Sequence, residues 1–512
     1  MRSDFGVNRD KAIMFIALAL FCIVTVTLML HHEAWGDEAR PWLLARNSPS
    51  IFNLLSIVGY EGTPGLWYLL TFVLVNLGLG YTALFILHSL IALAAVSIFL
   101  FCAPFSLTKR ILFIFSYLFV YEYNIIARNY AISALLLFII ASIWKRRFEK
   151  PILFSSLILL LVNSNVHSIP IGASILFVSA IEFYYSNKMF NKKILLSLLV
   201  VVFGFALSLY QIYPPPDLIP ELARWRTDIS MQHLGVLPHV FTSAFLPIPN
   251  PGPHSWNTYL LYDLFGKESA MLGIILFLIT VLFFVQKPAP LMVYLISVVG
   301  LEAIFFFKLT GGIRHHGLIF LTFFFSLWLS SFYQAEWTFL KKIAKKPLVN
   351  QLASFFIFFI LITQLTSGAI IAYQELKYEF STSKAAAAIL RGFGSKENVL
   401  IATFPKTLGE HVLPYMKKGT HFFRVEYNNY TDIIPYGKSS LHENNSNITD
   451  EEIIKRISNE KDGYKRVLLV IDREFDNGPV WNSTLVAYLN ESVNEDYLYI
   501  YEINFNNSTK IS

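Results

Sequence analysis

Long apolar runs separated by short basic segments fill most of the first 373 residues. The first run, "KAIMFIALALFCIVTVTLML", covers residues 11–30. Runs of about 20 residues can cross a hydrocarbon core of about 30 Å as helices. The pattern predicts eleven membrane-spanning helices, near residues 11–30, 82–104, 110–124, 130–145, 151–167, 169–185, 194–213, 269–286, 289–307, 315–334 and 349–373.

The basic clusters between these runs predict the orientation of the chain. Lys and Arg gather on the cytoplasmic side of membrane proteins. Arg2, Arg9 and Lys11 precede the first run, so we expect a cytoplasmic N-terminus. An odd number of spans then places the C-terminal residues outside, in the periplasm if the membrane is a bacterial inner (plasma) membrane. The other clusters lie at 109–110, 145–150, 188–193, 287 and 341–346.

Residues 31–81 must form one external loop for this orientation to hold. The loop contains the apolar segment "PGLWYLLTFVLVNLG", residues 64–78. Fifteen residues are few for a span, and apolar segments of that length are often interfacial. We therefore predict an amphipathic or interfacial helix here. The alternative, a true span, would place Lys109 and Arg110 on the outside.

The composition changes after residue 373. Charged residues and Asn become more frequent, and "STSKAAAAILRGFG" (381–394) has the pattern of a capped helix closed by Gly. Short apolar runs at 398–404, 421–427, 466–475 and 496–505 predict strands, with helices near 405–417, 449–459 and 479–492. The expected fold is an all-α polytopic membrane domain (1–373, with a second long external loop at 214–268) followed by a soluble extracytoplasmic α/β domain (374–512).

The overall composition agrees with a membrane protein and argues against a soluble, a nucleic-acid-binding or a disulfide-rich protein. The chain of 512 residues is 55% hydrophobic and 15% charged, whereas soluble proteins are about a quarter charged. The net charge of +6 follows from the cytoplasmic basic clusters, so we expect no nucleic-acid partner. Cys22 and Cys102 both lie in apolar runs, which excludes a disulfide framework.

The first external loop concentrates ionisable and aromatic residues directly after the first span. "HHEAWGDEARPWLLARNSPS", residues 31–50, contains the acid pair Asp37 and Glu38 flanked by Trp35 and Trp42. Carboxylates in a partly apolar medium have raised pKa values and act well as general bases. Asp37 and Glu38 are therefore the candidate catalytic residues.

Basic side chains recur at later external junctions, where the positive-inside rule does not expect them. "YEYNIIARNYA" (121–131) supplies Arg128 and Tyr130, and "FKLTGGIRHHGLIF" (307–320) supplies Lys308, Arg314 and His315. Guanidinium and ammonium groups pair with phosphate oxygens, so these five are candidates for binding a donor phosphate. Arg224 and Arg226 in the loop 214–268 are candidates for acceptor or lipid-headgroup contacts. The sequence context of His167 favours a packing role over a role in the site.

"HHEAWGDEARPWLLAR", "YEGTPGLWYLL" and "ARNYAISALLLF" together resemble the GT-C glycosyltransferases. The closest branch contains the protein-O-mannosyltransferases and aminoarabinose transferases of the dolichyl-phosphate-mannose transferase superfamily. The resemblance implies transfer of a monosaccharide from a polyprenyl-phosphate donor to a glycan, lipid or protein acceptor on the external face. It also implies an amphipathic helix in the first external loop and a soluble C-terminal domain.

Carried over by position, the resemblance gives Asp37 the role of activating the acceptor, with Glu38 as its partner. Arg128 and Tyr130 match the pair that lines the donor pocket, and Arg314 matches a basic residue near the donor phosphate. Thr63 stands where many members have His before Pro, which puts any role of that His in doubt for this chain. Some members use a divalent metal ion, for which His31, His32 and the acids offer ligands.

Two other functions remain open at the level of the sequence. An O-antigen polymerase or ligase also places arginines in external loops, but generally lacks both an acid pair after the first span and a C-terminal α/β domain. A lipid-linked sugar transporter would need charged residues at the centres of spans. Here the charges gather at one face, with Glu182 and Glu302 as the chief exceptions.

Overall fold

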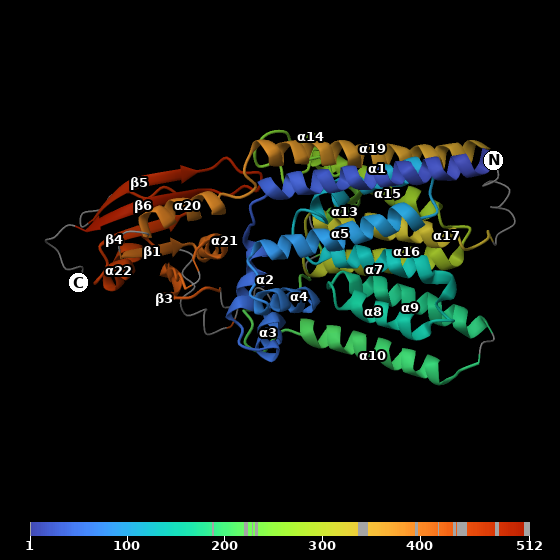
Figure 1. Cartoon of the computed structure of the whole chain (residues 1–512), viewed down its shortest axis with the longest axis horizontal. Coiled ribbons are helices and arrows are strands. Elements are labelled where there is room, and N and C mark those ends of the chain that lie inside the picture. The colour runs from blue at the N-terminus through green and yellow to red at the C-terminus, as the bar shows by residue number, and fades with distance from the viewer. Residues whose placement is uncertain are drawn as a thin grey trace.

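The computed structural model describes residues 2–186, 189–219, 224–227, 229–230, 234–335, 347–394, 398–417, 419–433, 437, 448–476 and 481–505. A bundle of roughly parallel helices forms one half of the molecule and a mixed sheet with three helices the other (Figure 1). Of the expected basic clusters, Lys188 and the cluster at 341–346 lie outside these residues.

Seven described helices are long and apolar enough to cross a membrane. They confirm a multi-pass helical region (Figure 1), in which α1 contacts both α5 and α19. The seven are α1 (Arg2–His31), α5 (Thr82–Cys102), α9 (Ser168–Tyr185), α10 (Lys192–Ile212), α14 (Leu260–Phe265) continued through a 3₁₀ turn by α15 (Ser269–Leu282), α16 (Pro288–Phe307) and α19 (Pro347–Lys377).

The other four expected spans correspond to shorter or more polar helices of the same bundle. α17 carries Arg314, His315 and His316 in its first turn, which lowers its hydropathy. The four are α6 (Leu107–Ile114) with a π-helical turn (Leu118–Glu122), α7 (Tyr130–Ile143), α8 (Pro151–Val162) and α17 (Ile313–Ser330).

The predicted second long loop, residues 214–268, contains a helix that packs into the bundle. Within it, "VLPHVFTSAF" forms α13 (Val236–Phe245), which packs against α15 and α17 inside the bundle. Ala244 and Phe245 are fully buried, and the Gln364 side chain donates to the Ala244 carbonyl at 2.9 Å. At ten residues the segment is too short to read as a span, so its burial depends on neighbours that are distant in sequence.

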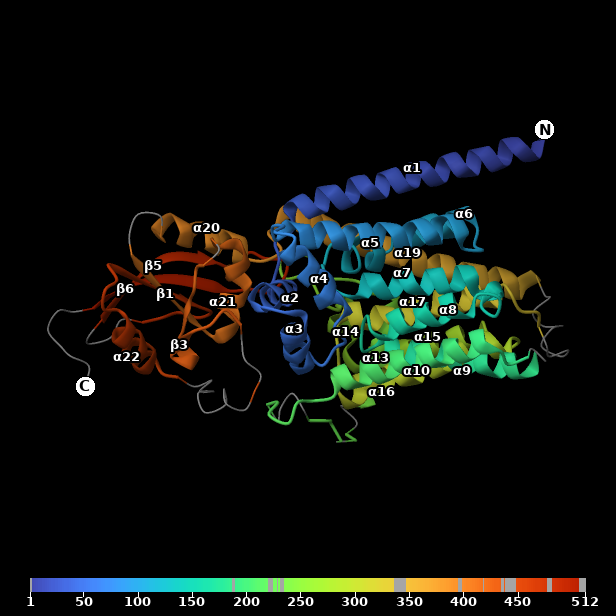
Figure 2. The same ribbon diagram turned by 60° about the horizontal axis from the view of Figure 1, so that its bottom comes forward.

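Residues 31–81, predicted as one loop, fold into three short helices at the end of the bundle nearest the sheet (Figure 2). They are α2 (Gly36–Asn47), α3 (Ile51–Val58) and α4 (Leu66–Asn76). Asp37 and Glu38 stand in the first turn of α2, where negative charge complements the helix dipole. With 11 residues, α4 extends about 16 Å. That is roughly half a hydrocarbon core, which suits the interfacial interpretation better than a span.

The C-terminal region confirms a mixed α/β fold. Its six strands are ordered β3-β2-β1-β4-β6-β5; β1 is parallel to β2 and β4, whereas β6 is antiparallel to β4 and β5. Helices α20 and α21 cover one face and α22 the other. The elements are α20 (Ser383–Gly394), β1 (Val399–Phe404), α21 (Lys406–Val412), β2 (Phe423–Arg424), β3 (Asn429–Tyr430), α22 (Asp450–Glu460), β4 (Arg466–Ile471), β5 (Trp481–Leu489) and β6 (Leu498–Phe505).

The prediction of a helix near 479–492 is wrong, because Trp481–Leu489 is strand β5. The strand pairs along its length with β6, and Tyr488 stacks on Tyr499 with ring centroids 4.3 Å apart. Cross-strand aromatic pairs of this kind stabilise a sheet, and they outweigh the weak local helix pattern. The other predicted strands and helices of this region are present, although the strand at 421–427 is reduced to two residues of β2 followed by a 3₁₀ turn.

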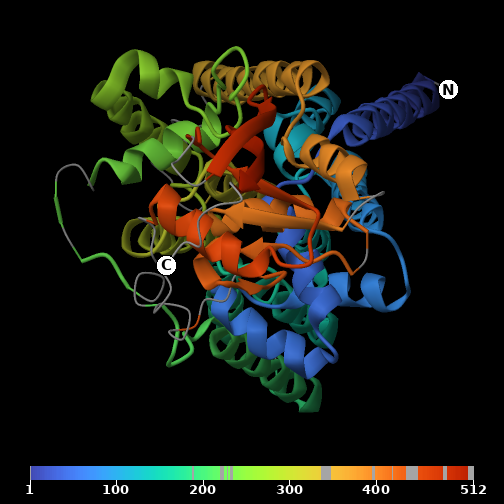
Figure 3. The same cartoon turned by 90° about the vertical axis from the view of Figure 1, so that its left-hand side faces the viewer.

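The sheet domain covers one end of the bundle and packs directly on helix α2 (Figure 3). Leu43 of α2 belongs to the same apolar cluster as Leu390 of α20 and Ile500 of β6. The Tyr415 hydroxyl accepts a hydrogen bond of 2.6 Å from the Ala34 N–H, and Arg46 pairs with Asp432 at 3.2 Å. Helix α2 is therefore part of both cores.

Candidate functional site

A cavity of about 590 Å³ lies where residues 31–81 meet the junctions before α7, before α9 and between α16 and α17. Its walls come from α2, the turn before α4, the start of α7, the turn before α9 and the ends of α10 and α16. The polar residues lining it are Asp37, Arg40, Tyr60, Glu61, Thr63, Tyr68, Arg128, Asn129, Tyr130, Asn165, His167, Arg224, Arg226, Lys308 and His315. Seven of the nine predicted site residues are therefore at one cavity; Glu38 and Arg314 do not line it.

Asp37 presents a partly exposed carboxylate to this cavity, with 38% of its side chain accessible. Its Oδ2 lies 3.0 Å from Nη2 of Arg314 and 3.6 Å from Nη2 of Arg128. Arg128 also donates from Nη1 to the Asp37 carbonyl. The two guanidinium groups therefore hold the carboxylate in place.

The expectation of a raised pKa for Asp37 is wrong. Burial alone would raise it, but the positive charges of Arg128 and Arg314 outweigh burial and hold the pKa of Asp37 below its ordinary value. The sequence placed the acid at an apolar interface and did not show that two arginines would reach it. In this state the carboxylate is ionised but weakly basic.

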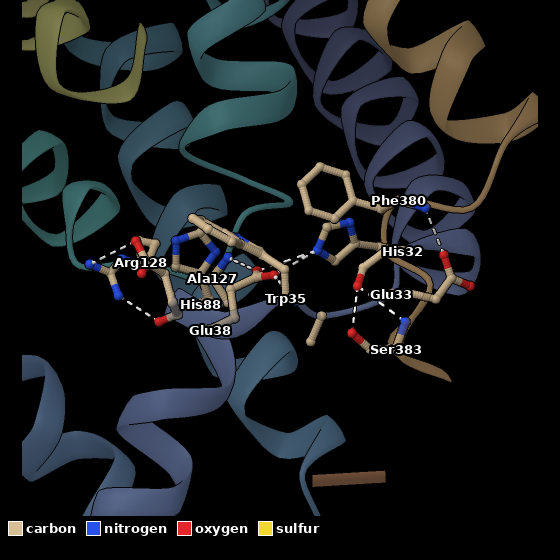
Figure 4. A network of polar contacts seen from close by, with 12 residues as sticks. His32, Glu33, Trp35, Glu38, His88, Ala127, Arg128, Phe380 and Ser383 are labelled. Atoms are coloured by element: carbon tan, nitrogen blue, oxygen red, sulfur yellow. Dashed lines mark hydrogen bonds and ion pairs between the residues drawn. The ribbon is translucent and has the colours of Figure 1, made fainter. Parts of the chain in front are cut away.

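Glu38 faces away from the cavity and is fully buried. Its carboxylate accepts from the Ala127 N–H at 2.5 Å and from the Trp35 N–H at 3.3 Å, and it pairs with Nε2 of His32 at 3.1 Å (Figure 4). The predicted catalytic partnership of Glu38 with Asp37 is therefore not what the geometry favours. Glu38 instead fixes the first turn of α2 against the segment that carries Arg128, and so positions both.

His32 bridges two buried carboxylates. Its Nε2 faces Glu38, and its Nδ1 lies 2.8 Å from Oε1 of Glu375, at the end of α19. Burial by itself lowers the pKa of His32, but the two carboxylates outweigh it and raise the pKa from 6.5 to about 10. The bridge ties α19, which leads into the sheet domain, to the loop that carries Asp37.

The raised pKa of His32 predicts a loss of stability at alkaline pH. The folded protein binds this proton more tightly than the unfolded chain does, so the stabilisation is complete below about pH 6.5 and lost as pH rises toward 10. We expect the thermal midpoint of the detergent-solubilised protein to fall over this range, and to fall much less in His32→Gln. His31→Gln is the control, since the exposed His31 ring lies 2.8 Å from the Thr27 carbonyl of its own helix. Equal pH slopes in all three proteins would contradict the assignment.

Arg128 and Tyr130 lie together at the entrance to α7, as the sequence predicted. Tyr130 is buried, stacks on Tyr123 at 6.0 Å and meets the ring of His315 edge-on at 5.4 Å. The Arg128 side chain reaches back to α2. The residue between them, Asn129, hydrogen-bonds Asn165 at 2.9 Å, which links this junction to the turn before α9.

The junction between α16 and α17 contributes three different side chains. Lys308 and His315 line the cavity, whereas Arg314 stands behind Asp37, with its guanidinium 5.3 Å from the rings of both Trp35 and Trp256. Cation–π contacts orient a guanidinium without neutralising it. Arg314, at the start of α17, and Arg128, just before α7, thus both contact Asp37.

Arg224 and Arg226 are exposed residues at the rim of the cavity. The Arg226 N–H donates to the Phe307 carbonyl at 2.7 Å, which attaches this part of the loop to the end of α16. The neighbouring residues 220–223 and 228 are outside the described part of the chain. Both arginines are thus placed to meet an anionic group that enters the cavity.

A buried ion-pair network that no sequence pattern predicted lies at the cavity wall. Arg40 pairs with Glu61 and with Glu410 of the sheet domain, each at 2.8 Å, and no more than 8% of any of the three side chains is exposed. The sequence indicated Glu61 only weakly as a site residue, as an acid beside a Gly-Thr-Pro turn before the predicted interfacial segment. No sequence pattern indicated Glu410, because it comes from the other domain.

A second, mainly apolar groove of about 680 Å³ adjoins the cavity. The two share Gly59 and Pro214 in their walls. The groove lies between α3, α4, α8 and α10, and the residues that line it include Phe52, Leu55, Leu66, Leu69, Leu159, Leu160, Leu207 and Tyr210. A charged chamber therefore lies next to an apolar one.

Among the described residues, no group of three or more His, Cys, Asp and Glu side chains is placed to hold a metal ion. His31 is turned to the outer face of α1, and His32 is engaged by its two carboxylates. The residues that the sequence offered as metal ligands therefore do not converge.

Neither protein-family models nor curated proteins match the chain. Its class thus rests on its own structure: a multi-pass membrane protein with a C-terminal mixed α/β domain. Beneath that domain lies a cavity rich in basic side chains around one accessible carboxylate.

Proposed function

We propose that the protein is an inverting glycosyltransferase of the GT-C class. It moves a monosaccharide from a polyprenyl-phosphate donor to an extracytoplasmic glycan, lipid or protein acceptor. One observation carries the proposal: Asp37 and five basic side chains line a cavity that adjoins an apolar groove. In the proposed topology, eleven spans cross a bacterial inner membrane, the N-terminus is cytoplasmic and the sheet domain is periplasmic and helps to bind the acceptor.

An amphiphilic phosphate ester suits both chambers. Arg128, Arg224, Arg226 and Lys308 supply charge-assisted donors for phosphate oxygens. The neighbouring groove offers apolar side chains for the first prenyl units. A soluble nucleotide sugar would need the charged chamber alone and would leave the groove without a role.

The transfer is a single displacement at the anomeric carbon. The acceptor oxygen attacks this carbon while Asp37 takes the proton from the acceptor hydroxyl. The bond to the phosphate oxygen breaks, and the phosphate leaves with the electron pair and is stabilised by the basic side chains. Attack opposite the leaving group inverts the anomeric configuration.

The pairing of Asp37 with two arginines couples the base to the donor. A phosphate that enters the cavity competes with the carboxylate for Arg128, which lines the cavity. As Arg128 turns toward the phosphate, the pKa of Asp37 rises toward its ordinary value and the carboxylate becomes a better base. Donor binding thus comes before acceptor activation.

The proposal is tested with the purified full-length protein in liposomes. Labelled polyprenyl phosphates carrying different hexoses or pentoses are mixed with an acceptor fraction from a bacterial envelope. We expect label to move to the acceptor with inverted anomeric configuration. The proposal is overturned if none of the polyprenyl phosphates binds. It is also overturned if the intact sugar lipid moves between leaflets without sugar transfer, because that result indicates a transporter.

Lys308→Ala should weaken the binding of bare polyprenyl phosphate about tenfold, since charge-assisted hydrogen bonds contribute about 1.5–3 kcal/mol. Lys267→Ala is the matched control, because Lys267 is an exposed lysine outside the cavity. Binding is followed by quenching of tryptophan fluorescence. Equal affinities for the two variants would remove Lys308 from the donor site.

A further inference from the structure

Two histidine rings contact one another in the wall of the cavity. The rings of His167 and His315 have centroids 5.1 Å apart and are inclined by 59°. Both residues line the cavity, and neither is more than 8% exposed. Their hydrogen bonds inside the protein determine which ring nitrogen of each carries the proton.

The proton of His167 is on Nδ1. The Asn165 Oδ1 accepts from the His167 N–H at 2.8 Å, so this amide oxygen is an acceptor, and it also lies 2.9 Å from Nδ1. Nδ1 must therefore be the donor. Nε2 is buried and has no hydrogen-bond partner within the part of the chain that the structure describes. A second proton on Nε2 would leave an unpaired cation in the interior, so Nε2 presents a lone pair.

The proton of His315 is on the opposite nitrogen. The Gly312 N–H donates to Nδ1 of His315 at 3.0 Å, which requires a lone pair on Nδ1 and a proton on Nε2. No described residue accepts from this Nε2–H. The two Nε2 atoms in the cavity wall are therefore one acceptor and one donor.

Neighbouring rings hold both imidazoles in place. His167 stacks on Phe305 at 5.4 Å and 29°, and Tyr130 meets His315 edge-on. Asn165 is itself held by Asn129 through its amide nitrogen. The pair is thus a rigid feature of the cavity wall.

We propose that His167 and His315 form a subsite for a neutral hydroxyl group of the transferred sugar. A hydroxyl both donates and accepts, so it matches a lone pair on His167 and an N–H on His315. An anionic phosphate oxygen would meet the His167 lone pair unfavourably. A metal ion would need a lone pair on both Nε2 atoms, which the Gly312 hydrogen bond denies to His315. The inference rests on the proposed function and assigns the sugar, rather than the phosphate, to this wall.

The test compares two kinds of probe on three proteins. The probes are farnesyl phosphate and its glycosyl esters with mannose, glucose, galactose or arabinose; the proteins are wild type, His167→Phe and His167→Gln, all full length in detergent. Phe keeps the stacking on Phe305 but removes the acceptor, whereas the Gln amide oxygen can replace Nε2. Dissociation constants come from tryptophan fluorescence, and thermal midpoints verify folding.

We expect at least one ester to bind wild type more tightly than farnesyl phosphate does. His167→Phe should lose roughly five- to tenfold in affinity for that ester, the effect of one neutral hydrogen bond, and keep its affinity for farnesyl phosphate. His167→Gln should recover most of the loss. The inference is overturned if no ester gains over the bare phosphate, if Phe weakens both probes equally, or if Phe weakens neither. Absence of any farnesyl phosphate binding to wild type would instead overturn the proposed function.

Discussion

Asp37→Asn should abolish sugar transfer while leaving the donor bound. Asn has almost the same shape but cannot take the acceptor proton, and loss of a positioned general base costs roughly 10²–10⁴-fold in rate. The substitution also releases Arg128 and Arg314 from their ion pairs with the carboxylate. We therefore expect unchanged or tighter donor binding together with the lower turnover. Both are measured in liposomes with the labelled donor.

The control for Asp37→Asn is Asp263→Asn. Asp263 lies on α14, hydrogen-bonds the Asn250 side chain at 2.6 Å and is outside the cavity, so its variant should transfer sugar at the wild-type rate. Asp37→Glu keeps a carboxylate and should retain part of the activity. Full activity in Asp37→Asn would sink the assignment of the base. Equal losses of donor binding and turnover would show that Asp37 binds the donor instead.

Arg40→Ala should produce the largest loss of stability of any substitution considered for this protein. It removes a buried cation from the carboxylates of Glu61 and Glu410, and breaking such a buried network costs about 3–5 kcal/mol. The loss should appear as a lower midpoint of unfolding in detergent, with earlier protease cleavage of the sheet domain. That domain is affected because Glu410 is its contact with Arg40.

The matched control is Arg473→Ala, which breaks a more exposed pair. Arg473 bonds Asp450 with 43% of its side chain exposed, and pairs of that kind contribute about 0–1 kcal/mol. A triple variant, Arg40→Met with Glu61→Gln and Glu410→Gln, removes the charges together and should recover much of the loss. Equal midpoints for Arg40→Ala and Arg473→Ala would contradict the energetic role of the network.

Local pattern was sufficient to predict most helices and strands. The apolar runs at 82–104, 169–185 and 289–307 became α5, α9 and α16, because their periodicity and length depend on neighbouring residues alone. The strands β1, β4 and β6 had similarly strong local signals. β5 was mistaken for a helix because its conformation depends on pairing with β6, and α13 was missed because its burial depends on distant helices.

The site was predictable in location but not in detail. Membrane topology alone predicted that Asp37, Arg128 and Lys308 would share one face, and they line one cavity. The sequence could not predict that Asp37 lines the cavity while Glu38 is buried away from it. Adjacent residues on a helix point about 100° apart, and only the packed structure shows which of them faces the cavity. The link from His32 to Glu375 spans 343 positions, and no local pattern could show it.

The shared helix α2 limits how the chain can be recombined with others. Its first turn carries Asp37, while Leu43 on the next turns packs into the core of the sheet domain. A chimera that exchanged only residues 378–512 would place a foreign surface against the helix that orients the carboxylate. Residues 36–47 and the sheet domain must therefore be exchanged together, and substitutions fixed in one should be accompanied by compensating changes in the other.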